Sequence, residues 1–117
     1  MSPAPGAWAQ GLALFAEGAW HEAHERFEEL WRQHGRRTPE GHLLQALVQL
    51  CASELKRESG GRAAGRLASR AADHLDGLPD PLLGVRTAEL AARIRGPTRP
   101  VSIPLVPNPL DGGGGLG

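Results

Sequence analysis

The chain has little of what marks secreted, membrane-spanning or strongly charged proteins. Its 117 residues include a single cysteine, which excludes an internal disulfide and fits a reducing compartment. Lysine plus arginine and aspartate plus glutamate both number 13, so no net charge attracts nucleic acid or a membrane surface. No run approaches the roughly 18 apolar residues of a membrane span, and the first ten residues lack the pattern of a secretory signal. We therefore expect a cytoplasmic protein without nucleic-acid or membrane partners.

Any long alternation of apolar and polar residues is also missing, which argues against β strands before residue 97. Apolar residues instead recur with helical spacing between glycine and proline signals. Gly18 and Gly35 are placed to end helices, and Thr38-Pro39 supplies an N-cap followed by proline at the first helical position. Asp80-Pro81 repeats this helix start. The sequence predicts an all-α fold with helices at about residues 7–17, 20–34, 39–58, 62–76 and 81–95.

Composition divides the chain into one helical domain, residues 1–95, and a tail, residues 96–117. The tail holds five prolines and six glycines, so we expect it to be extended or disordered. Val101, Ile103 and Leu105 alternate, as in a segment that lies extended in a surface groove. We favour a free tail, because chain ends are usually poorly ordered.

Glycine also marks a weak internal repeat, since Gly18 and Gly60 are each followed five residues later by a small residue. Two antiparallel helix pairs hinged at these glycines would resemble tetratricopeptide-type hairpins. Two units are too few for a solenoid. The expected architecture is therefore a compact bundle of about five helices, made of two hairpins, a C-terminal helix and the tail.

The third predicted helix is apolar around nearly its whole circumference, which is typical of a central helix. A narrow polar stripe of His42, Gln45 and Gln49 interrupts it. A buried glutamine amide without partners costs roughly 1–3 kcal/mol, and the matching polar groups are His24 and Glu28 of the second helix. We therefore predict that the second and third helices face each other through a polar seam.

The second predicted helix holds the residues best suited to chemistry. His21, His24, Glu25 and Glu28 fall within roughly a quarter-turn of one another at about 100° per residue. Imidazoles and carboxylates at this spacing bind metals or transfer protons, so the four are candidate metal ligands. The pattern also fits a buried polar cluster that specifies helix register, which is the interpretation we favour. Trp31, two turns after His24, could wall a pocket beside it.

No complete metal motif accompanies these residues. Di-metal helical bundles take carboxylates from several helices, and zinc proteases need His-Glu-x-x-His, whereas the two histidines here are three residues apart. His42 and His74 on other helices could add ligands, but no second motif points to them. We expect no cofactor, with a bound metal ion as the alternative. Cys51, in a leucine-rich window without an acidifying neighbour, is predicted to be a core residue rather than a nucleophile.

Two motifs stand out in the second and third helices. The first is Gly18, Trp20 and the run from Glu22 to Trp31, EAHERFEELW, and the second is LQALVQ, residues 44–49. Together they resemble the domain of unknown function 309 family, small all-helical proteins of bacteria and archaea, over about residues 8–95. Alanine at position 46 stands where the family prefers glycine. The resemblance implies a helical fold and singles out His24, Glu28, Trp31, Gln45 and Gln49, but it implies no activity.

The leading hypothesis is a non-catalytic interaction or ligand-binding module for a protein or a small molecule. Its polar pocket would be lined by His24, Glu28, Trp31, Gln45 and Gln49. The alternative is a metal-dependent, hydrolase-like enzyme in which His24 is the general base and Glu28 orients it. Whether the protein is an enzyme stays open on the sequence.

A homodimer is a further hypothesis about partners. Trp8, Leu12 and Phe15 of the first predicted helix form an aromatic and leucine surface that could make a symmetric interface.

Overall fold

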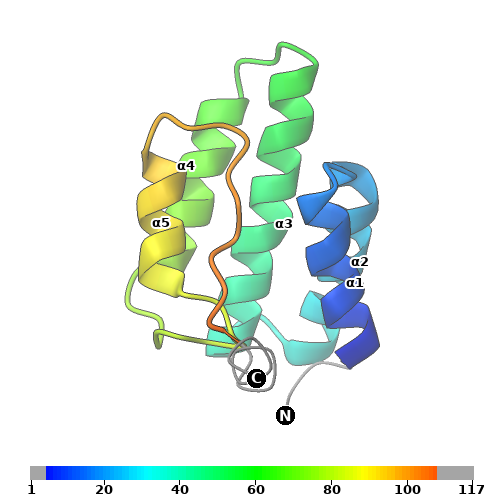
Figure 1. Ribbon diagram of the computed structural model, residues 1–117, viewed down its shortest axis with the longest axis vertical. Coiled ribbons are helices and arrows are strands. Elements are labelled where there is room, and N and C mark those ends of the chain that lie inside the picture. Colours follow the sequence, from blue (N-terminus) through cyan, green and yellow to red (C-terminus); the bar gives the residue numbers. More distant parts are fainter. Residues whose placement is uncertain (1–4, 108–117) are drawn as a thin grey trace, which may run out of the picture.

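The computed structural model describes residues 5–107, which form five α helices and no strands. This confirms the all-helical class, and Figure 1 shows the arrangement. No helix within this range is long and apolar enough to cross a membrane. The helices are α1 (Pro5–Ala16), α2 (Trp20–His34), α3 (Pro39–Glu58), α4 (Ala64–Leu75) and α5 (Thr87–Arg95).

Local signals place the junction between α2 and α3. Gly35 follows α2 with φ 84°, a conformation that costs other residues steric strain. Thr38 then caps α3, because its Oγ1 accepts a hydrogen bond of 2.9 Å from the backbone N–H of Gly41, and Pro39 occupies the first helical position. Both helices therefore begin and end where the sequence predicts.

The fifth helix begins at Thr87, so the prediction that it starts at Pro81 is wrong. Leu82 and Val85 exchange two backbone hydrogen bonds of 2.9 and 2.8 Å, which folds this segment into a tight turn. Val85 is fully buried, and its burial favours the turn over helix. Asp80 still acts as a cap, but from a distance, since its Oδ1 accepts the backbone N–H of Thr87 at 3.0 Å.

Helix α3 lies at the centre of the molecule, as predicted, with α2 and α4 packed on either side of it. Helix α1 packs against α2, and α5 packs against α4, so both cover the same side of this three-helix layer (Figure 1). The core is continuous through the layer. From α3 it takes Leu43, Leu44, Ala46, Leu47, Leu50 and Cys51, all at most 1% exposed.

Residues 99–106, which we call the strap, run extended between α5 and α1 (Figure 1). The backbone N–H of Arg86 donates to Pro104 at 2.9 Å, and that of Val106 donates to Gly84 at 2.8 Å. Val101 is buried, while Leu105 is 47% exposed. The preference for a free tail is therefore wrong for the strap, and the alternative of an extended segment in a groove is correct there. Residues 108–117, the rest of the predicted tail, lie outside the described range.

Candidate functional site

One flank of α2 carries the polar residues that the sequence singles out. His24, Glu28 and Trp31 follow one another at helical spacing and are all half-buried, beside the buried face formed by Trp20, Ala23, Phe27 and Leu30. We call these three residues the α2 flank. Glu28 accepts a hydrogen bond of 2.8 Å from Arg32, one turn further along the same helix. The carboxylate is therefore paired within α2.

The hydrogen-bond donor of Trp31 lacks a partner within residues 5–107. Its Nε1 is buried, and no acceptor lies within hydrogen-bonding distance of it in the described part of the chain. The guanidinium of Arg36 lies 5.2 Å from the centre of the indole ring, which places a positive charge over it. Trp20 differs, because its Nε1 donates to Glu58 at 2.9 Å. A buried donor left without an acceptor costs about 1–3 kcal/mol.

One residue of the polar stripe of α3, His42, faces α4. His42 Nδ1 lies 3.5 Å from Nδ1 of His74 in α4. Gln49 is seven residues after His42 and so lies within roughly 20° of the same helix face. Its Oε1 is buried, again with no hydrogen-bond partner among residues 5–107. Burial lowers the pKa of His74, His42 lowers it further, and the charge of Asp73 opposes both effects.

The five predicted pocket residues are thus spread over two helices and are not joined to one another. Within residues 5–107, no hydrogen bond connects the α2 flank to Gln45 or Gln49, which are both half-buried. The hydrogen-bonded seam between α2 and α3 stays a prediction. The sequence did not reveal that α4 would offer His74 to the stripe, because only the packing of α4 brings position 74 beside position 42.

The four candidate metal ligands do not form a compact set. His21 and Glu25 are exposed and 3.9 Å apart, and Glu28 pairs with Arg32. Among the described residues, no group of three or more histidine, cysteine, aspartate or glutamate side chains is positioned to hold a metal ion. The helical spacing brings these residues to neighbouring positions, but it does not make their side chains converge.

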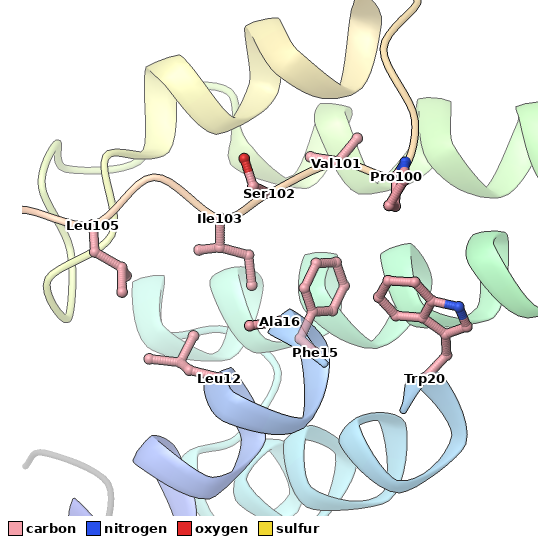
Figure 2. A pocket seen from close by; sticks show the side chains of 9 residues that line it. All are labelled: Leu12, Phe15, Ala16, Trp20, Pro100, Val101, Ser102, Ile103 and Leu105. Carbon is pink, nitrogen blue, oxygen red and sulfur yellow. The ribbon is translucent and has the colours of Figure 1, made fainter. Parts of the chain in front are cut away.

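An apolar cavity of about 230 Å³ lies between the strap and the end of α1. Figure 2 shows Phe15 and Trp20 directed toward the strap residues Pro100 and Val101 across this cavity. The aromatic rings of Phe15 and Trp20 pack edge to face, with their ring centroids 4.9 Å apart. Phe15 is only 2% exposed, so it is not part of the surface suggested for a homodimer. That dimer stays a prediction.

Cys51 is a core residue, as predicted from its surroundings. It is fully buried in α3, and burial, together with the charge of Glu54, raises the pKa of its thiol to about 12. At neutral pH the thiol is therefore protonated and unreactive. We expect Ellman's reagent to label native protein at least about a thousandfold more slowly than protein in urea, because labelling requires unfolding. Labelling of native protein at a rate close to that in urea would contradict this placement.

The described residues form a small all-helical domain, and the polar residues singled out by the sequence lie on α2 and on α3. The chain belongs to the family Domain of unknown function (DUF309), whose model matches residues 8–67. It is also similar to the crystal structure of a conserved hypothetical protein, TTHA0068, from Thermus thermophilus. That match has a TM-score of 0.66 and 31% sequence identity, and it covers 80% of this chain and 95% of the other. The curated proteins include no match to the chain. These likenesses identify a family and a fold for which no function is established.

Proposed function

We propose that this domain is a non-catalytic binding module and that its ligand docks on the α2 flank. The single observation that carries the proposal is the Nε1 donor of Trp31, which is buried and has no acceptor among the residues that the structure describes. A carbonyl or carboxylate oxygen inserted beside the indole would accept this hydrogen bond and remove the cost of the unpaired donor. Glu28 and His24, half-buried one and two turns before Trp31, would line the approach.

The positive charge of Arg36 determines which kind of hydrogen-bond acceptor would bind best beside Trp31. Arg36 lies over the indole ring and is not paired with a carboxylate in the described structure. A cation at this position favours an anionic acceptor over a neutral one, because charge-assisted hydrogen bonds are the stronger kind. The ligand class is therefore a carboxylate, from a small molecule or from an acidic group of a protein.

The architecture that presents this flank is two antiparallel helix pairs, α1–α2 and α3–α4, of the tetratricopeptide-like type. In that arrangement α2 and α3 belong to different hairpins. A ligand on the α2 flank would then lie at the junction between the hairpins, where binding surfaces of stacked helical pairs form.

Nuclear magnetic resonance of the three indole N–H groups tests this function. Acetate, succinate and benzoate, with acetamide as the neutral comparison, are titrated into ¹⁵N-labelled protein. We expect a saturable downfield shift of the Trp31 indole proton with the carboxylates, because its N–H gains an acceptor. The Trp20 indole proton, already bonded to Glu58, should not move.

Trp31→Phe and Trp20→Phe are the test variant and its matched control in this titration. Trp31→Phe keeps an aromatic ring but removes the donor, so binding should be lost, whereas Trp20→Phe should leave it intact. Arg36→Gln should weaken carboxylate binding and leave acetamide unaffected. If no carboxylate shifts the Trp31 signal, or if Trp20 and Trp31 shift alike, the α2 flank is not the binding site.

A further inference from the structure

Two imidazoles meet between α3 and α4, away from the α2 flank. Nδ1 of His42, in the first turn of α3, lies 3.5 Å from Nδ1 of His74, near the end of α4. The two ring centres are 5.7 Å apart and the ring planes differ by 34°. Both side chains are half-buried, so solvent reaches the pair while packing restricts the rings.

A direct hydrogen bond accounts poorly for this arrangement. One imidazole would have to donate from Nδ1 and the other accept at Nδ1, and 3.5 Å is longer than the usual range for a nitrogen donor. The two Nδ1 atoms are nevertheless close enough together to bind one ion. Neutral imidazole is the commonest metal ligand in proteins.

We propose that His42 and His74 form a binding site for a divalent transition-metal ion of the zinc and nickel class, with the two Nδ1 atoms as ligands. Zinc–nitrogen bonds of 2.0–2.1 Å at a tetrahedral angle put two ligand nitrogens roughly 3.3–3.4 Å apart. The observed 3.5 Å matches this spacing closely. Imidazole also suits nickel and copper, so the site selects for this class of metals and against magnesium and calcium.

The protein supplies two ligands, and water would complete the coordination. Among residues 5–107 no third histidine, cysteine, aspartate or glutamate joins the pair in a metal-binding group. The neighbouring Asp73 forms an ion pair with Arg95 at 3.2 Å. Because the ligands come from two helices, a bound ion would tie α3 to α4 and stabilise the folded state, in which alone the pair exists.

The test uses the untagged full-length chain, with Zn²⁺ and Mg²⁺ titrated by calorimetry and the melting temperature measured in parallel. We expect Zn²⁺, but not Mg²⁺, to bind one equivalent and raise the melting temperature. His42→Gln and His74→Gln should each weaken Zn²⁺ binding at least about tenfold. His21→Gln, which removes an exposed imidazole next to Glu25, is the matched control and should change neither result.

A second measurement needs no variant. Ni²⁺ added to unmodified protein should broaden the ring signals of His42 and His74 before those of the other three histidines. The assignment is overturned if Zn²⁺ binding is the same in both glutamine variants and the parent. It is equally overturned if Ni²⁺ broadens His21 and His24 first, which would place the metal on α2.

Discussion

Replacing Gly41 by alanine is expected to lower the free energy of unfolding by about 2–3 kcal/mol, although alanine is the better helix former. Gly41 lies in the first turn of α3, beneath the loop that leaves α2. A Cβ atom at this position would lie 1.8 Å from the carbonyl oxygen of Gly35 and 3.0 Å from Oγ1 of Thr38. The carbonyl belongs to the backbone, so the whole loop would have to move. The helix preference of alanine, about 1 kcal/mol, offsets only part of this cost.

Gly65→Ala is the matched control for this experiment. Gly65 also lies in the first turn of a helix, α4, but an added Cβ would meet nothing within 4 Å. We expect stability to stay the same or to rise by up to about 1 kcal/mol. Urea denaturation followed by circular dichroism measures both variants. Equal stability of the two would show that the α2–α3 loop does not approach Gly41 as described, and the position of α2 against α3 would need revision.

Removing the positive charge of Arg57 is expected to cost about 2–3 kcal/mol, because it leaves the carboxylate of Glu54 without its partner. Glu54 is only 1% exposed and lies among the core residues of α3. Its Oε1 accepts hydrogen bonds from Nε of Arg57 at 2.9 Å and from Nη2 of the same residue. Its Oε2 is buried and has no partner in the described structure. Arg57 is partly exposed, so water screens the loss and keeps the cost below that of a fully buried pair.

Comparison of a single and a double variant separates this effect from a general loss of packing. Arg57→Met keeps the aliphatic length and removes the charge, and Glu54→Met added to it removes the buried carboxylate. We expect the double variant to recover much of the stability lost in Arg57→Met, since apolar replacements of a buried pair are often close to neutral. Arg32→Met is the comparison on the surface and should cost no more than about 0.5 kcal/mol, because its pair with Glu28 is exposed. A neutral Arg57→Met would contradict the buried position of Glu54.

Helix boundaries were predictable where they depend on residues close in the sequence. Thr38 caps α3 through the N–H three residues later, and Gly35 ends α2, so the chemistry of both signals is complete within a few positions. The prediction of where α5 starts failed because the residues that determine this start are not adjacent in the sequence. Asp80 caps a helix that begins seven residues later, after Val85 has been buried in the intervening turn.

For the candidate site, too, the sequence predicted local features but not contacts between helices. That His24, Glu28 and Trp31 lie on one flank of α2 follows from helical periodicity alone. What they contact does not follow from it. The sequence predicted that Glu28 would meet the polar stripe of α3, whereas in the structure its carboxylate accepts a hydrogen bond from Arg32 on α2 itself. The absence of an acceptor for the Trp31 donor within residues 5–107 depends on every helix that packs nearby, so no pattern in the sequence predicted it.

By itself, the sequence determined the all-helical class, the central place of α3 and the polar flank of α2, because turns, caps and helical repeats act over four residues or fewer. Only the tertiary structure decided which groups meet across helices. It brought His74 to His42 over 32 positions of chain, and it laid the strap between α1 and α5. Such pairings depend on how whole helix faces pack against one another. Burial of apolar area drives this packing, and because it is non-directional, the order of residues in the sequence does not specify which helices meet.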